Sequence, residues 1–518
     1  MSVSSRTFYS SLVALQYADP GRFEHGLNNS GYPVDDGGAM SALNSALSGG
    51  TASFALATGS GSRLAGTGTG TGSGTPATDN ATARALRADW AKSQYHVTGS
   101  GITIGVMSDS FNLQGGMAAD QANGDLTKHV TILKEGSSGF DEGRAMAEII
   151  HSVAGNAHIL FYTATDGEQD FANGIEALAN AGAQIIVDDV AYLDEPFFQD
   201  GSAVQSAVED VVSRGVNYFT AASNEGTNYY QSGFTAMRAV LPGLVGAWTV
   251  NNFGSLGAPQ SAVTLTIPRG GATRVDLQWD QPFAGIGGSS GSANSLAMAL
   301  YTADGRLVAT AGVNRTGSNP DQVLSYTNNS GATSFHLVVL SNAQATPPSE
   351  FKFIIYGSGT IQNAHAGSGS GTVIGHEMVP GANTVGAVYY GNSARYGGSN
   401  SVEGFSSVGS GDFLYDKTGH RLANPVSTQK VTFLAPDGDM TSVLAPFYGT
   451  SAAAPAAAAV AALVLQADPY LTPAQVTSVL GYTASSASGP LGSVGAGMIN
   501  AQAAVTLASA IFHHTATI

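Results

Sequence analysis

The sequence lacks cysteine and contains little charge. Its 518 residues include 20 basic and 37 acidic side chains, which gives a formal net charge of −17. Without cysteine the chain forms no disulfide and offers no thiolate as nucleophile or metal ligand. A nucleic-acid partner requires clustered Lys and Arg, so this scarcity of positive charge argues against nucleic-acid binding.

Long apolar runs are also missing from the sequence. The most apolar stretch, 452–465, is shorter than the roughly 18 residues that span a bilayer and is interrupted by Pro455. The first twenty residues lack the basic start and apolar stretch of a secretory signal. Low charge and abundant Gly, Ser and Thr are typical of exported bacterial proteins. We therefore expect no membrane span. We also expect a secreted or cell-surface protein that uses a route without a recognisable signal peptide, with a leader missing from this sequence or a cytoplasmic location as alternatives.

The sequence divides into segments that differ in composition and in the period of their apolar residues. Residues 1–80 are interpreted as an N-terminal extension that ends in a Gly/Thr/Ser-rich linker over 59–75. A propeptide and a tethering segment are both compatible with this extension. Residues 246–370 alternate apolar and polar positions with period two, which predicts an inserted antiparallel β-sandwich. The insert is either a binding module, for substrate or a surface ligand, or a passive spacer.

The flanking segments, 81–245 and 371–518, predict one discontinuous α/β domain. Short apolar runs alternate there with segments whose apolar residues recur at helical spacing, as expected for a doubly wound, mostly parallel sheet. The predicted strands are 102–107, 158–163, 185–190, 217–222 and 384–388. The predicted helices are 142–154, 171–181, 203–214, one that begins after residue 451 and one that begins at residue 473.

Three polar residues stand where catalysis is common. Ser451 follows Gly449 at the start of a predicted helix, where free N–H groups favour negative charge. Asn224 follows a predicted strand, and its amide could help Ser451 to hold an oxyanion. Asp109 ends another apolar strand, at the edge where α/β sheets place their ligands. Taken singly, the same residues could be a helix cap and two ordinary turns.

Together with other motifs, these residues resemble the subtilisin-like serine peptidases. The resemblance covers roughly 85–245 and 370–508 and implies that Ser451 is the nucleophile, Asn224 the oxyanion-hole amide and Asp109 the triad aspartate. The motifs, in family order, are the strand that ends in Asp109, AASNEG (221–226), FSSVG (405–409), LAP (434–436), GTSAAAP (449–455) and GAGMINA (495–501).

The sequence departs from the subtilisins at the catalytic base. Aligning the segment 141–151 places Glu142 where subtilisins have their histidine. A glutamate at this position resembles the sedolisins, which are serine-carboxyl relatives active in acid. Sedolisins also carry an aspartate one helical turn later, where this chain has Met146, and an aspartate in the oxyanion hole, where it has Asn224. The chain therefore resembles a hybrid of the two groups.

Two further carboxylates follow a buried strand. Asp188 and Asp189 could couple to Glu142 or line a pocket for a basic substrate group, and a structural role is an equal alternative. We expect no cofactor. A structural calcium ion stays open, but the sequence shows no clear site for it and no metal ligands are assigned. The histidines at 129, 376 and 420 lie in predicted loops and are interpreted as structural or solvent-facing.

These observations predict a serine endopeptidase that acts on polypeptides. Glu142 would accept the Ser451 proton, and Asp109 would orient Glu142 and share a proton with it. A carboxylate base of this kind predicts activity favoured by acid pH. The alternative is a catalytically silent subtilisin-like protein used for binding or surface adhesion.

Overall fold

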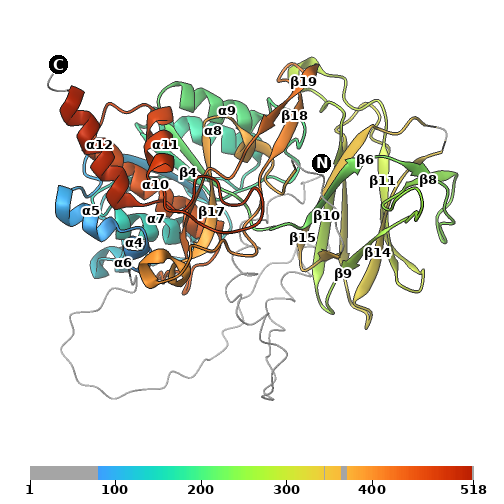
Figure 1. Ribbon diagram of the computed structural model, residues 1–518, viewed down its shortest axis with the longest axis horizontal. Coiled ribbons are helices and arrows are strands. Elements are labelled where there is room, and N and C mark those ends of the chain that lie inside the picture. Colours follow the sequence, from blue (N-terminus) through green and yellow to red (C-terminus); the bar gives the residue numbers. More distant parts are fainter. Residues whose placement is uncertain (1–79, 344, 363–369, 516–518) are drawn as a thin grey trace, which may run out of the picture.

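Seven parallel strands form the central sheet of the protein (Figure 1). The computed structural model describes residues 80–343, 345–362 and 370–515. All six strand pairs are parallel, so the expectation of a doubly wound sheet is confirmed. In spatial order the strands are β2 (Val130–Lys134), β3 (His158–Thr163), β1 (Thr103–Ser108), β4 (Ile185–Asp188), β5 (Asn217–Ala221), β17 (Ala382–Tyr389) and β20 (Phe433–Asp437).

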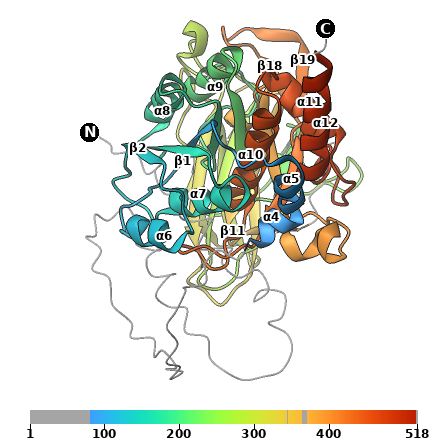
Figure 2. The same ribbon diagram turned by 90° about the vertical axis from the view of Figure 1, so that its left-hand side faces the viewer.

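Helices cover both faces of this sheet (Figure 2). The larger core lies on the face that carries α4 (Ala81–Ala85), α5 (Ala88–Tyr95), α7 (Glu142–Val153), α10 (Thr450–Ala467), α11 (Pro473–Tyr482) and α12 (Ala501–Thr515). The opposite face packs against α8 (Glu168–Asn180) and α9 (Ala203–Ser213), and the short α6 (Met117–Asn123) precedes β2. The expected extension at 1–80 lies outside the described residues, apart from Asn80.

The helix α10 runs through the middle of the larger core. Its 18 residues have a mean hydropathy of 1.5, and by length and composition alone they could cross a membrane. We expected no run of this length, but the helix continues through Pro455. Most of its side chains are alanine, which lets the helix approach the sheet closely. Because 89% of the apolar window is buried inside the protein, this is the pattern of a core helix.

The insert forms a β-sandwich beside the α/β domain (Figure 1). One sheet contains β13 (Asp321–Thr327), β10 (Ala272–Trp279), β15 (Glu350–Gly357) and β6 (Tyr229–Gly233). The other contains β12 (Leu307–Ala311), β11 (Leu296–Thr302), β14 (Ser334–Asn342), β8 (Trp248–Asn251), β7 (Ala236–Met237), β9 (Val263–Thr266) and β16 (Thr360–Gln362). The first strand, β6, precedes the expected boundary at residue 246. Its sequence, YYQSG, is too short and polar to signal a strand.

The sandwich and the α/β domain share a buried apolar contact. Phe197, Tyr229, Ile354 and Leu414 belong to this cluster. The antiparallel hairpin of β18 (Gly411–Tyr415) and β19 (Arg421–Thr428) adds to it, since the Tyr415 hydroxyl donates to the Asp280 carbonyl at 2.9 Å. Because β6 follows shortly after the turn that carries Asn224, the insert is tied directly to the predicted site.

Candidate active site

The carboxyl ends of neighbouring strands bring the predicted site residues together. Asp109 follows β1, Asp189 follows β4, and Asn224 lies three residues after β5. The three strands are hydrogen-bonded in the order β1–β4–β5, so the segments that follow them meet at one edge of the sheet. In open α/β sheets this edge is where ligands bind.

Ser451 lies at the start of α10, as the sequence predicted. It is the second residue of the helix and is only 4% exposed. Gly449 precedes the helix with a φ of 105°, a conformation that suits glycine. The Gly449 N–H donates to Asp437 Oδ2 at 2.8 Å, which fixes this turn. The N–H of Ser451 lies in the first helical turn, where N–H groups have no acceptor within the helix and remain available to an oxyanion.

The side chain of Asn224 is held against this turn. Its Oδ1 accepts from the Thr450 N–H at 3.0 Å and from the Thr450 hydroxyl at 3.1 Å. These bonds fix the amide plane of Asn224 against the start of α10. A β-carbon added at Gly449 would lie 3.6 Å from the Asn224 amide nitrogen and 3.8 Å from the Ser451 nitrogen, so these two donors are close neighbours.

Glu142 begins α7 and is fully buried. Its carboxyl group is adjacent to the Ser451 hydroxyl and to the Asp189 carboxyl. The Ser451 hydroxyl faces the Glu142 carboxyl and the Ser108 hydroxyl faces that of Asp189, but among the described residues neither contact has the geometry of a full hydrogen bond. Two carboxyl groups that face each other can bond only when one of them carries a proton. The arrangement therefore favours a shared proton between Glu142 and Asp189.

Burial dominates the titration of this acidic pair. It is the main cause that raises the pKa of Glu142 well above its ordinary value, and the charges of Asp189 and Asp109 add to it. The pKa of Asp189 rises to about 8, again mainly through burial and next through the charge of Asp109. Two such groups titrate as a unit, so their proton is released at a pH well above that of an ordinary carboxyl group.

Asp109 contacts the backbone around Glu142. Its Oδ1 accepts from the Glu142 N–H at 2.9 Å, and its Oδ2 accepts from the Phe140 N–H at 2.6 Å. We expected Asp109 to share a proton with Glu142, but the carboxyl group that faces the Glu142 side chain is that of Asp189. Burial raises the pKa of Asp109, while its three backbone hydrogen bonds oppose this shift. Asp109 thus holds the start of α7 in position.

Asp188 points away from Glu142 and binds a histidine that the sequence did not single out. His376 Nε2 lies 3.2 Å from Asp188 Oδ1, and its Nδ1 lies 2.7 Å from Glu195 Oε2. All three side chains are buried. No local pattern marks this cluster, because His376 lies in a predicted loop 188 residues from Asp188.

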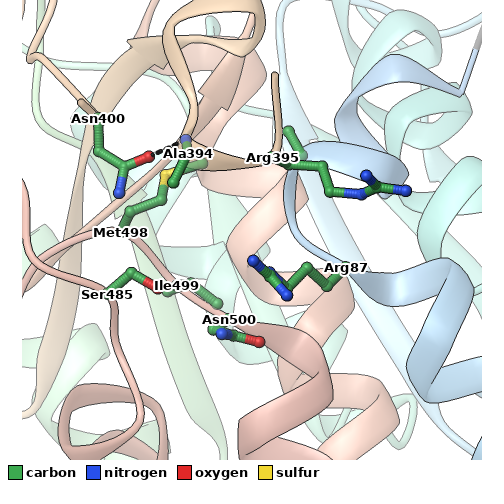
Figure 3. A pocket seen from close by; sticks show the side chains of 9 residues that line it. Arg87, Ala394, Arg395, Asn400, Ser485, Met498, Ile499 and Asn500 are labelled. Carbon is green, nitrogen blue, oxygen red and sulfur yellow. Dashed lines mark hydrogen bonds between the residues drawn. The ribbon is translucent and has the colours of Figure 1, made fainter. Parts of the chain in front are cut away.

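A surface hollow elsewhere in the chain lies apart from these residues. Arg87, Asn400 and Asn500 contribute to its lining, with Arg395 on its rim (Figure 3). None of the candidate catalytic side chains lines it. Within the described ranges, no group of three or more His, Asp or Glu side chains is arranged to hold a metal ion. Ser451, Asn224 and a cluster of carboxyl groups make up the candidate site.

Comparison with known proteins identifies the family. The model of the subtilase family matches residues 115–497, which is well over half of the chain. No curated protein matches the sequence. Among solved structures, the CspB protease of Clostridium perfringens has a TM-score of 0.52 at 12% identity and shares the fold. The match covers 82% of this chain and 97% of that one.

Two other solved structures match with lower TM-scores. MycP1 without its N-terminal propeptide is 17% identical with a TM-score of 0.40, over 82% of this chain and 96% of that one. A lanthipeptide protease is 12% identical with a TM-score of 0.40, over 84% of this chain and 99% of that one. The family match and the arrangement of Ser451 and Asn224 lead to one conclusion: the chain belongs to the subtilase family of serine peptidases.

Proposed function

We propose that this subtilase is a serine-carboxyl endopeptidase in which Glu142 replaces histidine as the catalytic base. The observation that carries the proposal is the fully buried Glu142 carboxyl group between the Ser451 hydroxyl and the Asp189 carboxyl. A glutamate that served only the fold would gain nothing from burial beside a second acid and a helix-start serine, since burial of unpaired carboxyl groups is costly.

The first half of the reaction uses the ionised form of Glu142. Glu142 accepts the Ser451 proton as Oγ attacks the peptide carbonyl. The Ser451 N–H and the Asn224 amide stabilise the negative oxygen of the tetrahedral intermediate. Glu142 then donates the proton to the leaving amine, and the acyl group stays on Ser451. In the second half, water attacks the acyl group with Glu142 again as the base.

Asp189 and Asp109 support Glu142 in different ways. Asp189 faces the Glu142 carboxyl and stabilises its protonated form by sharing the proton. Asp109 fixes the backbone from which the Glu142 side chain extends. This division modifies the role expected for Asp109 from the family resemblance, since the proton-sharing partner becomes Asp189.

The pH range of activity follows from the same pair. The active form carries one proton on the pair, and this proton moves from Glu142 to Asp189 as Glu142 takes up the Ser451 proton. Below the raised pKa of Glu142 the base is protonated and activity falls. As the pH rises through about 8, Asp189 also ionises and the shared proton is lost. We therefore expect a bell-shaped profile with little activity in alkali, where both carboxyl groups are ionised.

Cleavage of a denatured protein between pH 3 and pH 9 tests the proposal. The parent should cleave it, and Ser451→Ala and Glu142→Gln should each lower kcat by a factor on the order of 10³ or more. Cleavage that survives in Glu142→Gln would move the base to another residue. Absence of cleavage by the parent at every pH would favour a binding protein without catalytic activity.

The place of action is a separate proposal. The low charge and Gly, Ser and Thr content support a secreted or cell-surface bacterial protein. Fractionation of the source cells, followed by immunodetection, tests this. Recovery only in the cytoplasm would contradict it.

A further inference from the structure

A short buried turn contacts the ends of the two strands, β4 and β5, that lead into the active site. This turn, η2 (Gly375–Met378), follows the return of the chain from the insert and is completely buried. His376 contacts Asp188 at the end of β4, and Glu377 contacts Ser223 just after β5. One turn thus contacts both strand ends that carry the site.

His376 anchors the turn on the side of β4. It bridges Asp188 and Glu195, and the ring of Phe171 packs edge-on against it at 5.3 Å. The Thr220 hydroxyl of β5 also donates to Asp188, at 2.9 Å. A β-carbon at Gly375 would lie 2.3 Å from Glu195 Oε2, so the turn is packed directly on these carboxylates. The position of the turn is therefore strongly constrained.

Glu377 holds the residue that precedes Asn224. The Ser223 hydroxyl donates to Glu377 Oε1 at 2.6 Å, and the Ile374 N–H donates to Oε2 at 3.2 Å. Ser223 has a φ of 64°, which is the left-handed region that a serine seldom occupies. Such a conformation costs on the order of 1–3 kcal/mol and persists only where its surroundings enforce it. Two contacts hold Ser223 here: its hydroxyl donates to Glu377, and its carbonyl accepts from the Ser407 N–H at 3.1 Å.

The charged groups around Glu377 come from both domains. His376 is next to it in the turn, and Glu225 belongs to the same segment as Asn224. Lys352 of β15 is buried in the contact with the sandwich and is attracted to Glu377. The insert therefore places a buried lysine near Glu377, and burial lowers the pKa of this lysine to about 7.

We propose that Glu377 is a positioning residue for the oxyanion hole: it holds Ser223 in its left-handed conformation and thereby directs the Asn224 amide towards the reacting carbonyl, while His376 anchors the turn. This inference deepens the proposed function and depends on the Ser451 reaction, although it does not depend on which residue acts as the base.

Steady-state kinetics of Glu377→Ala test the inference. Loss of the carboxyl group should lower kcat by a factor of about 10 to 100, somewhat less than loss of an oxyanion donor itself, and leave KM within about twofold. Glu377→Gln should recover most of kcat, because its amide oxygen can still accept the Ser223 hydroxyl. If Glu377→Ala folds and keeps the parent kcat, the inference is overturned.

Double variants separate positioning from general stability. If Glu377 acts through Asn224, adding Glu377→Ala to Asn224→Ala should cost little further kcat. Full additivity of the two losses would contradict the inference. Should Glu377→Ala fail to fold, Ser223→Ala removes the same hydrogen bond from the other side. It should lower kcat by a similar factor, and an unchanged kcat would count against the inference.

Asp280→Asn is the matched control. Asp280 is a buried carboxylate of the sandwich that also accepts a serine hydroxyl, from Ser349, but it has no link to Asn224. This variant should lower thermal stability and leave kcat unchanged, and an equal loss of kcat would show that Glu377 is merely structural. Ser451→Ala in parallel keeps the two proposals apart, because cleavage by that variant would overturn the proposed function itself.

Discussion

Glu142 can serve as a base only because its surroundings change its chemistry. A solvent-exposed glutamate has a pKa near 4.3 and is a weak base towards serine. Burial beside Asp189 and Asp109 raises the pKa of Glu142, so its affinity for a proton moves towards that of histidine. Part of this rise in pKa comes from the charge of Asp189, and a histidine base would not need such a second carboxyl group.

Asp189→Asn should move the acid limb of the pH–rate profile. The Asp189 charge raises the pKa of Glu142, so its removal should lower that pKa and extend activity to lower pH. The alkaline limb near pH 8 should also disappear, because no second carboxyl group of the pair remains to ionise. The pH dependence of kcat/KM measures both limbs. Identical profiles for the parent and Asp189→Asn would contradict the pairing.

Asp109→Asn should displace Glu142 and leave the alkaline limb of the pH–rate profile in place. Asparagine keeps one side-chain acceptor where Asp109 accepts from three backbone N–H groups, so the start of α7 should loosen. We expect kcat to fall by a factor of about 10 to 100 and the free energy of unfolding to fall by about 1–3 kcal/mol. Kinetics and chemical denaturation check this, and loss of the alkaline limb would instead assign Asp109 to the shared proton.

The sequence could predict the residues that belong to motifs. Ser451, Asn224 and Glu142 follow from short patterns and lie together in the structure. The sequence offered Asp188 and Asp189 alike as partners of Glu142, and which of them faces Glu142 depends on how far β1 and β4 extend before their chains turn. His376 and Glu377 were missed because their partners lie in distant segments and no local pattern marks them.

At the scale of elements, the position of Glu142 depends on close packing of α7 against β1 and β3. Gly143 donates its N–H to the Ser110 carbonyl at 3.0 Å. A β-carbon at Gly143 would lie 2.4 Å from the Phe161 ring and 2.8 Å from that carbonyl oxygen. No side chain fits this contact without displacing the helix start.

Gly143→Ala should therefore impair both the fold and the reaction. We expect a loss of about 1–3 kcal/mol in the free energy of unfolding, from overpacking, and a reduced kcat because Glu142 is displaced. Gly257→Ala is the control, since its added methyl group meets no atom within 4 Å. Equal stability and kcat for the two variants would show that α7 is not constrained in this way.

The periodicity of the sequence predicted most elements of the α/β domain to within a few residues. Buried parallel strands and amphipathic helices carry strong local patterns, so β1, β3 and α7 were recognised. The start of the sandwich was missed because the short β6 is polar and gains its stability from pairing with β15. The length of α10 was underestimated because tight packing in the core tolerates Pro455 within the helix.

At the scale of the whole molecule, several buried acids make stability dependent on pH. The pKa values of Asp189 and Glu377 rise to about 8 and that of Glu148 to about 7, in each case chiefly through burial. A carboxyl group with a raised folded-state pKa binds its proton more tightly in the folded state. The stability that it contributes is therefore lost as the pH rises from the unfolded pKa, near 4, through the folded one.

Thermal denaturation should show this trend between pH 5 and pH 7. Each such proton lowers the free energy of unfolding by about 1.4 kcal/mol per pH unit in this range, so Tm should fall by several degrees. His376 adds to the fall above its unfolded pKa of about 6.5, while Lys352 and Lys430 act in the opposite direction only above about pH 7. Glu142→Gln should raise Tm at pH 7. A Tm that rises steadily from pH 5 to pH 7 would contradict these assignments.

The most direct test of the Glu142 base is the rate at which a fluorophosphonate modifies Ser451, followed by intact mass from pH 4 to pH 9. In the parent this rate should rise as Glu142 ionises and fall again as the pH passes about 8. In Glu142→Gln it should drop by a factor on the order of 10² or more at every pH. A rate in Glu142→Gln that equals the parent rate, or a parent rate that keeps rising into alkali, would contradict the carboxylate mechanism.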